Sequence, residues 1–230
     1  MKCGFIGLGV LGSKMAAKIL DAGHALRVYD RDTKAVDKLV AAGAINARSV
    51  QEATSNIDAL ITCLPSPAAC EEVMTGDGGA LSSLAPGNCW IEMSTTDVDE
   101  MKRLALLAGE KSIDVLECPA TGGVHRAAKG QMTLLVGGDE ALFQRYRPLL
   151  EIMGGQIVYM GEIGNASLIK VVTNLLCLVD LVAMGEALML AKRGGLDLAR
   201  CYEAITASSG NSREFEDWAP VILNGSFNTG

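Results

Sequence analysis

KCGFIGLGVLGSKMAAKIL, residues 2–20, is the stretch that decides the fold of this chain. A short apolar run, residues 3–6, leads into Gly7, Gly9 and Gly12, and residues 13–20 then suit a helix. In a dinucleotide fingerprint the first glycine makes a turn, the second lets the backbone approach a pyrophosphate, and the third lets the helix pack on the strand. The stretch therefore predicts a strand, a tight turn and a helix, with Gly7, Leu8, Gly9, Val10, Leu11 and Gly12 around a dinucleotide.

The residues on either side of this turn strengthen the prediction. Backbone N–H groups of residues 11–13 and the positive end of the helix dipole would hold two phosphates without a basic side chain. The next predicted strand, residues 25–29, ends at Asp30, about twenty positions after the glycines, where a ribose diol needs an acceptor. Asp30 favours NAD, whereas Arg31 would favour NADP, so both nicotinamide cofactors stay open. The alternative is a glycine-rich turn in an α/β protein that binds no nucleotide.

Composition excludes some classes of partner. The chain has 230 residues, 49% of them hydrophobic and 20% charged, which allows one large domain or one domain plus part of another. Its net charge of −7 and its aromatic content of 4% argue against a nucleic-acid partner.

Cysteine usage and the N-terminus predict a compartment. The seven cysteines include no CxxC pair and mostly lie in apolar runs, so we expect buried thiols, no disulfide framework and no metal site. The N-terminus enters a strand directly, without the pattern of a signal peptide. Both observations favour the cytoplasm.

The apolar segment 175–191, LLCLVDLVAMGEALMLA, is the one that resembles a membrane span. Asp180 and Glu186 interrupt it, and lipid would leave them without partners. We expect a helix that is buried on most sides inside protein, and no membrane partner.

The order of elements predicts an α/β fold of the Rossmann type, with a doubly wound and mostly parallel sheet. Strands are expected at 44–45, 58–64, 88–93, 113–117, 131–137 and 156–160; helical segments are expected at 33–42, 49–54, 69–74, 98–108 and 139–150. Strands cease near residue 163, and helices follow at about 165–193, 198–207 and 213–223. We place the domain boundary at 163/164, with a dinucleotide-binding domain at 1–163 and a helical domain at 164–230.

Several strands end in residues that suit a ligand crevice, because α/β sheets bind ligands beyond the carboxyl ends of their strands. Leu64 and Pro65 would line the nicotinamide side, and Thr95 would face the same crevice. The hydroxyls of residues 94–96 would alternatively cap the next helix. Thr121, Gly122 and Gly123 expose backbone N–H groups that suit a carboxylate, although spacing alone favours a plain loop.

Lys170 is the candidate acid or base. It lies among apolar residues early in the long helix, and Asn174 follows it by one turn on the same strip. Lys170 could give a proton to a substrate carbonyl oxygen while Asn174 holds the lysine or the hydroxyl. From the residues alone, a structural lysine with its amine in water is the stronger alternative.

Together these segments resemble the β-hydroxyacid dehydrogenase family over essentially the whole chain. GFIGLGVLG resembles its cofactor signature, CLPSP its next cofactor loop, STT at 94–96 its threonine motif, ECPATGG its substrate-binding motif, and GEIGNASLIKVVTN its catalytic helix. The resemblance implies a nicotinamide-dependent oxidoreductase of small 3-hydroxy acids or semialdehydes, with Lys170 catalytic, Asn174 beside it and Thr121 to Gly123 on the substrate carboxylate. It also implies a homo-oligomer, a dimer or a tetramer, in which the long helix packs across subunits.

Two departures from the family pattern leave alternatives. His125 and Arg126 follow the glycine pair where the family usually has smaller or different residues; they would either alter substrate choice or form a plain solvated pair. Family members also continue beyond Gly230, so a cofactor-binding or scaffolding protein without turnover is the second hypothesis. A relative of imine reductases is the third, although that group typically lacks the lysine.

Overall fold

The computed structural model describes residues 1–122, 126–127 and 129–226. Contacts divide the chain into two compact units, Met1–Lys170 and Val171–Gly230, which are described separately below. The predicted domain boundary at 163/164 stays a prediction.

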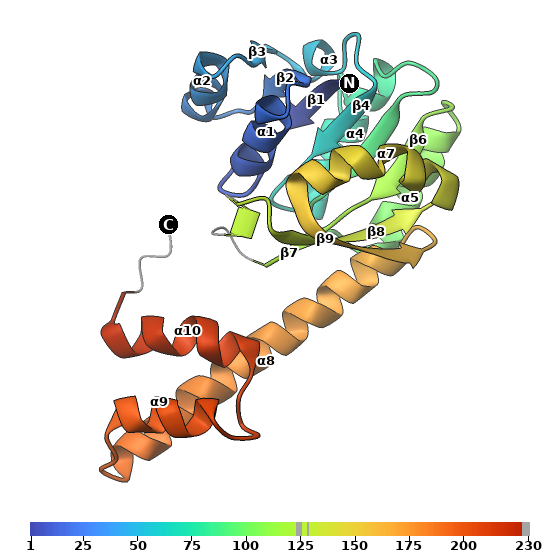
Figure 1. The fold of residues 1–230 in the computed structure, drawn as a ribbon. Helices are drawn as coiled ribbons and strands as arrows, with labels where there is room; N and C mark the ends of the chain where they lie inside the picture. The colour runs from blue at the N-terminus through green and yellow to red at the C-terminus, as the bar shows by residue number, and fades with distance from the viewer. Residues whose placement is uncertain (123–125, 128, 227–230) are drawn as a thin grey trace. The chain divides into compact units, whose positions relative to one another are not determined.

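The first unit is built on one sheet whose strands follow the order β3-β2-β1-β4-β5-β6-β8-β7, with β9 paired to β8 (Figure 1). Its strands are β1 (Lys2–Ile6), β2 (Ala25–Tyr29), β3 (Ile45–Asn46), β4 (Ala59–Thr62), β5 (Cys89–Glu92), β6 (Asp114–Glu117), β7 (Ala120–Thr121), β8 (Met132–Gly138) and β9 (Gly154–Gly161). From β3 to β6 all neighbours are parallel. The chain leaves β1 toward β2 on one side and later returns to β4 on the other, so the strand order reverses between β1 and β4. This reversal is where doubly wound sheets form a ligand crevice.

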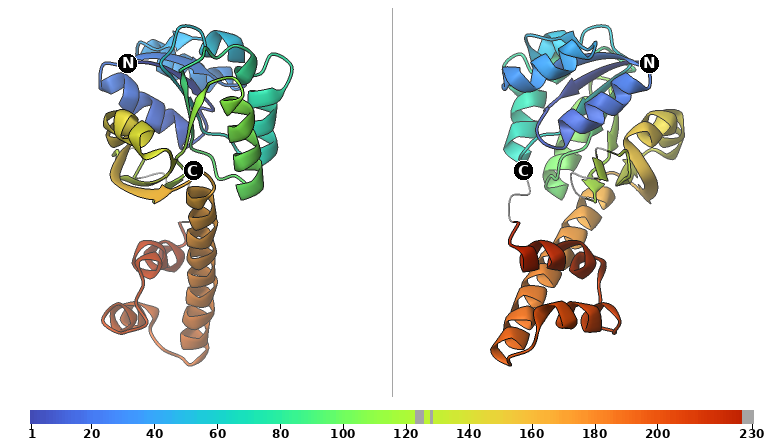
Figure 2. Two further views of the ribbon diagram at one scale, coloured as in Figure 1. Left: turned by 90° about the vertical axis from the view of Figure 1, so that its right-hand side faces the viewer. Right: turned by 60° about the vertical axis from the view of Figure 1, so that its left-hand side comes forward.

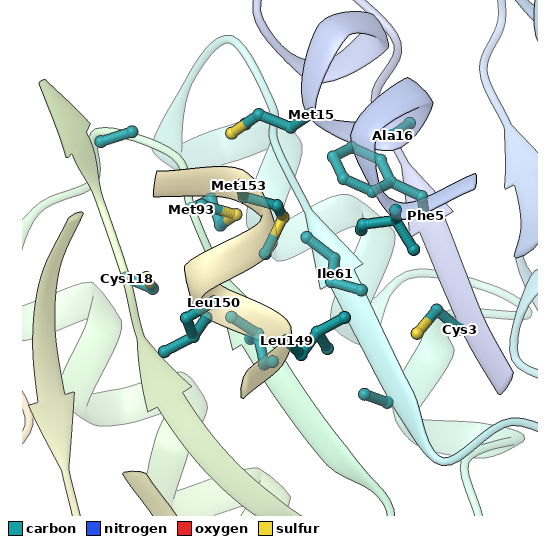
Figure 3. Packing of buried hydrophobic residues seen from close by; sticks show 14 of the residues in the cluster. Cys3, Phe5, Met15, Ala16, Ile61, Met93, Cys118, Leu149, Leu150 and Met153 are labelled. Carbon is teal, nitrogen blue, oxygen red and sulfur yellow. The ribbon is translucent and has the colours of Figure 1, made fainter. Parts of the chain in front are cut away.

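Helices cover both faces of this sheet, as the views of Figures 1 and 2 show. They are α1 (Gly12–Asp21), α2 (Thr33–Ala41), α3 (Val50–Ala53), α4 (Pro67–Thr75), η1 (Ala80–Ser82), α5 (Val98–Gly109) and α7 (Glu140–Met153). One core cluster contains buried side chains of α1, α2 and α7, and the other contains side chains of α3, α4 and α5. Figure 3 shows Met15, Leu150 and Met153 packed over strand residues such as Ile61. Strands buried on both faces explain the nearly continuous apolar runs in the sequence.

Side chains at the N-cap positions fix where several of these helices begin. Asp32, Ser49, Ser66, Asp97 and Asp139 each accept a hydrogen bond from a backbone N–H of the helix that follows. The expectation that a hydroxyl of residues 94–96 caps α5 is therefore wrong. Asp97 supplies that cap because its carboxylate accepts from two N–H groups of the first turn.

The second unit contains α8 from Val171 onward, α9 (Leu198–Thr206) and α10 (Arg213–Asn224); α8 as a whole spans Asn165–Arg193. Its small core joins Met184, Leu188, Phe215 and Ala219. Tyr202 stacks on the ring of Phe215 with 5.6 Å between centroids. These contacts hold the three helices of the unit together.

The expectation that segment 175–191 is buried on most sides is wrong. A helical stripe on α8 is exposed: Leu175 by 60%, Leu178 by 60%, Val179 by 54% and Val182 by 62%. The sequence showed the apolar face but not what covers it. By length and composition alone, α8 is also long and apolar enough to cross a membrane, but core helices of soluble proteins pass the same test.

Candidate active site

A cavity of about 730 Å³ lies beside the carboxyl ends of β1, β2 and β4 in the first unit. It brings together most of the predicted cofactor residues. Its lining includes Gly7, Gly9, Val10, Leu11, Gly12, Asp30, Arg31, Leu64, Pro65 and Thr95. Segments that are far apart in sequence thus meet at the predicted edge of the sheet.

The three glycines of the fingerprint have three different surroundings. Gly7 has a φ of 95°, and a Cβ there would lie 2.2 Å from the carbonyl oxygen of Cys63. A Cβ on Gly12 would lie 2.0 Å from the carbonyl oxygen of Gly7, so the helix starts against the turn. A Cβ on Gly9 would meet nothing within 4 Å, and Gly9 lines the cavity. The turn and the close packing thus belong to Gly7 and Gly12, while Gly9 leaves open space on the cavity side.

The N-terminus of α1 carries no side-chain cap. The expectation that residues 11–13 all offer N–H groups to a ligand needs one correction, because the N–H of Ser13 donates to the carbonyl oxygen of Gly9 at 3.0 Å. The remaining N–H groups at this helix start are not used by a side-chain cap, and the glycine turn places them beside the cavity. Such N–H groups can bind phosphate oxygens. This part of the site therefore fits a dinucleotide.

Asp30 binds the glycine loop as well as lining the cavity. Its Oδ2 accepts from the N–H of Leu8 at 2.5 Å, and its Oδ1 accepts from the N–H of Asp32 at 2.7 Å. The side chain of Leu8 is buried and does not line the cavity, so the loop contact of Leu8 is through its backbone. Each carboxylate oxygen keeps a second lone pair, which leaves Asp30 able to accept from a ribose hydroxyl.

A buried acidic side chain, Glu92, organises another part of the cavity wall. Glu92 accepts from the N–H of Ser94 at 2.6 Å and from the hydroxyl of Thr62. Trp90 donates its indole N–H to Thr62 at 2.8 Å, and Leu64 donates its N–H to the hydroxyl of Ser94 at 2.7 Å. Burial raises the pKa of Glu92 above its usual value, and the hydrogen bonds from Ser94 and Thr62 oppose that rise. The network fixes the loops that carry Leu64 and Ser94 into the cavity wall.

The threonine motif and the substrate motif lie close to this wall. Thr95 and Ser94 line the cavity, and the buried Oγ1 of Thr96 has no hydrogen-bond partner within the described chain. Ala120 lines the cavity too, and Thr121 beside it on β7 is half-buried. Gly122 has a φ of 123°, whereas Gly123 and His125 lie outside the described residues. The structure therefore places only part of the predicted carboxylate site.

Lys170 and Asn174 lie one turn apart on α8. Lys170, the last residue of the first unit, is buried, with 8% of its surface exposed. Asn174 is half-buried and belongs to the second unit. A lysine with its amine in bulk water would be far more exposed, so the structure contradicts that alternative. Lys170 is not one of the described residues that line the cavity.

Sequence reasoning missed one wall of the cavity. Glu72 and Val73 of α4 and the glycine-rich segment 76–79 line it, as do Tyr29 and Val50. The run Gly76-Asp77-Gly78-Gly79 was a usable signal, because glycines let a backbone approach a ligand. The side chains of α4 gave no such signal, since which face of a helix meets a cavity depends on tertiary packing.

The cysteines of the first unit are poor nucleophiles. Cys63 lines the cavity, and burial raises its pKa to about 12. Burial likewise raises the pKa of Cys3 to about 11. Within the described residues, no group of three or more His, Cys, Asp or Glu side chains could hold a metal ion.

Comparisons with known protein families account for both parts of the chain. Residues 2–161 match the NAD binding domain of 6-phosphogluconate dehydrogenase, and residues 164–230 match the NAD-binding domain of NADP-dependent 3-hydroxyisobutyrate dehydrogenase. The chain belongs to the β-hydroxyacid dehydrogenase family. It is therefore an NAD(P)-dependent oxidoreductase of hydroxy acids with the Rossmann-type fold predicted above, and a scaffolding role without catalysis is not favoured.

Individual proteins that the chain resembles support this assignment to the dehydrogenase family. The chain is 33% identical to 2-hydroxy-3-oxopropionate reductase of Escherichia coli, over 100% of this chain and 78% of that protein. It is 37% identical to the NAD-dependent L-serine dehydrogenase of Pseudomonas aeruginosa, over 96% of this chain and 72% of that protein.

A solved structure extends the similarity to the fold. Mycobacterium tuberculosis 3-hydroxyisobutyrate dehydrogenase with L-serine superposes with a TM-score of 0.85 at 33% identity, covering 93% of this chain and 72% of that one. Imine reductase structures, such as the one from Myxococcus stipitatus at 19% identity, share the fold alone.

Proposed function

We propose that this dehydrogenase interconverts a small 3-hydroxy acid and its semialdehyde, with Lys170 as the general acid and base. The observation that carries this proposal is the burial of the lysine on the first two turns of α8, in a chain of this family. The bound nicotinamide would exchange a hydride with the substrate carbon. Lys170 would donate a proton from its Nζ to the carbonyl oxygen in the reductive direction and take it from the hydroxyl in the oxidative direction.

We assign the cofactor contacts to the cavity. Gly7, Gly9, Val10, Leu11 and Gly12, together with Leu8 through the loop, would hold the pyrophosphate. Asp30 would accept from the ribose hydroxyls, and its charge would repel a 2′-phosphate, which makes NAD the proposed cofactor despite Arg31. Leu64, Pro65 and Thr95 would lie against the nicotinamide.

The substrate contacts follow the family motif. Thr121, Gly122 and Gly123 would bind the carboxylate through hydroxyl and backbone donors. Asn174 would hold the hydroxyl or Lys170. Relatives named for 2-hydroxy-3-oxopropionate, 3-hydroxyisobutyrate and L-serine all act on compounds with a carboxylate near a hydroxyl or carbonyl carbon, which supports this substrate class.

A cofactor and substrate screen tests the proposal. Tartronate, methylmalonate and succinic semialdehydes and glyoxylate would each be assayed at 340 nm with NADH and with NADPH. We expect turnover with a three-carbon semialdehyde and NADH, and a fall in kcat of at least about 100-fold in Lys170→Ala with unchanged NADH binding. Lys38→Ala, on the surface of α2, is the control for loss of a lysine. Full activity of Lys170→Ala would refute the role of this residue.

We also propose a cytoplasmic homo-oligomer. The exposed apolar stripe Leu175, Leu178, Val179 and Val182 supports an additional partner for α8, and a second copy of the chain would cover it. Reduced, buried thiols support a reducing compartment.

A further inference from the structure

We infer that Glu117 is a positioning residue for Lys170, acting from the sheet on the first turn of α8; this rests on the function proposed above for Lys170. Glu117 is the last residue of β6 and is completely buried. It does not line the cavity described above. Its two oxygens are instead used by the helix that carries the lysine.

The carboxylate accepts four hydrogen bonds from the start of α8. Oε1 accepts from the N–H of Gly164 at 2.6 Å and of Ala166 at 2.9 Å. Oε2 accepts from the N–H of Ser167 at 3.1 Å and from its hydroxyl at 2.5 Å. A carboxylate that accepts several N–H bonds at a helix start is favoured by both charge-assisted hydrogen bonding and the helix dipole.

Glu117 does for α8 what an N-cap side chain does for the other helices. The first intrahelical bond runs from the N–H of Leu168 to the carbonyl of Gly164, so Gly164 occupies the N-cap position. Glycine has no side chain with which to cap, and its φ of 101° disfavours any residue that has one. The cap therefore has to come from elsewhere in the chain.

The sheet leaves a slot for this carboxylate. Gly137 on β8 pairs directly with Glu117 on β6. A Cβ on Gly137 would lie 2.3 Å from Oε1 of Glu117. A side chain there would push the carboxylate out of line with the donors of α8, so the strand pair is built around the contact.

The contact is made on the face of the helix that bears the lysine. Residues three and four apart lie on one helical face, and Ser167 and Ala166 precede Lys170 by these spacings. All three are buried, whereas Leu168 is 55% exposed. Four bonds from one strand fix the rotation of the first turn of α8 about the helix axis and its position along that axis. This rotation and this axial position together determine where the amine of Lys170 lies.

Glu117→Gln in the full chain tests this inference. The substitution keeps the shape but replaces one acceptor oxygen with a donor that faces N–H groups. We expect kcat to fall on the order of 10- to 100-fold, since small misplacements of a reacting group have effects of this size. NADH binding should change less than about twofold, because Glu117 does not line the cavity. Glu117→Asp should recover part of kcat.

A matched control separates positioning from stability. Asp139→Ala removes the cap of α7, a helix that carries none of the proposed site residues. It should lower Tm without lowering kcat. A double variant gives the decisive readout: in a Lys170→Ala background, Glu117→Gln should cause no further loss of turnover, because its effect passes through the lysine.

Two further measurements do not depend on turnover. Hydrogen exchange of the Ala166 and Ser167 amides should accelerate in Glu117→Gln, and the pH dependence of amine labelling at Lys170, followed by peptide mass spectrometry, should shift. Ser167→Ala, which removes one of the four bonds, should act in the same direction if Glu117→Gln does not fold.

The outcomes distinguish this inference from the proposed function. Loss of turnover in Lys170→Ala with normal kcat and normal labelling in Glu117→Gln would overturn the role of Glu117 alone. Unchanged turnover in Lys170→Ala would instead overturn the proposed function, whatever Glu117→Gln does. Equal further loss in the double variant would make Glu117 a general stability residue and would also overturn the inference.

Discussion

The side chain of Asp30 both binds backbone N–H groups and lines the cavity. It accepts from the N–H groups of Leu8 and Asp32, and it lines the cavity beside Arg31. Removing its charge would therefore change both the glycine loop and the part of the cavity proposed for the adenosine ribose. The two effects can be separated because only the second differs between NAD and NADP.

We predict that Asp30→Asn weakens NADH binding about tenfold and weakens NADPH binding less, since the amide no longer repels a 2′-phosphate. Fluorescence titration with both cofactors measures the ratio. Asp32→Asn removes the same charge two residues away, keeps an N-cap side chain on α2, and should leave the ratio unchanged. Equal weakening for both cofactors would mean that Asp30 acts on the loop alone.

Glu92 should make stability depend on pH. The pKa of Glu92 in the folded chain is raised above 4.5, the value expected in the unfolded chain, so the folded state keeps the proton up to a higher pH. Its contribution to stability is therefore complete below about pH 4.5 and is lost as the pH rises through the folded pKa.

We expect the Tm of the wild type to fall relative to that of Glu92→Gln as the pH is raised from 4.5, the ordinary pKa value of the carboxyl group. Calorimetry across this range gives the difference. Asp37→Asn, on the exposed surface of α2, controls for the loss of one carboxyl. A constant difference between wild type and Glu92→Gln would argue against a protonated Glu92.

Sequence patterns predicted the positions of some site residues and missed others. The fingerprint glycines, Asp30 and Leu64 follow from local spacing, because turn and strand-end residues meet at the crevice in any fold of this class. Glu92 and Glu117 were missed because they bind groups on distant elements: Thr62 is 30 residues from Glu92, and the donors to Glu117 are 47 to 50 residues away. An acidic residue inside an apolar strand was the available signal for both.

At the scale of elements, the start of α1 shows how two glycines of one motif differ. Gly12 packs against the carbonyl of Gly7, whereas Gly9 adjoins open space. The same substitution at the two positions should therefore separate packing from ligand binding.

Gly12→Ala should lower the free energy of unfolding by about 2 kcal/mol, since the new methyl group overlaps a backbone oxygen. Gly9→Ala should leave Tm nearly unchanged, because its methyl group would meet nothing within 4 Å, and should still weaken NADH binding, because Gly9 lines the cavity proposed for the pyrophosphate. Denaturant titration and NADH titration of both variants measure this. Unimpaired NADH binding by Gly9→Ala would place the pyrophosphate elsewhere.

Most elements were predictable from periodicity and terminators. The predicted bounds 25–29 and 165–193 agree with β2 and α8, and the other predicted elements differ only at their ends. The short strand β7 was missed inside the CPATGG segment, because its two residues become a strand only by pairing with β8. The burial of α8 was predicted wrongly for a related reason: an apolar face does not specify its partner.

At the scale of the whole molecule, the exposed apolar stripe of α8 leads to a prediction about oligomerisation. Leu175, Leu178, Val179 and Val182 have the spacing of one helical stripe. Leu106 on α5 is 72% exposed and lies in the first unit, outside this stripe.

We predict that Leu178→Glu with Val182→Glu converts an oligomer to a monomer, because two charges would have to be buried in the interface. Analytical ultracentrifugation measures the mass. Leu106→Glu should leave the mass unchanged. A wild-type monomer at micromolar concentration would contradict the proposed assembly.

Glu117 precedes the donors that it binds by 47 to 50 residues, and this separation bears on the order of events when the chain folds. The middle of α8 can coil from local contacts in well under a millisecond, but its first turn must wait for β6 and β8 to close a long loop. In pulse-labelled refolding, Ser167 should therefore gain protection together with β6 and after the middle of α8; the reverse order would count against this. A nascent chain would thus acquire its sheet before the amine of Lys170 is fixed in place.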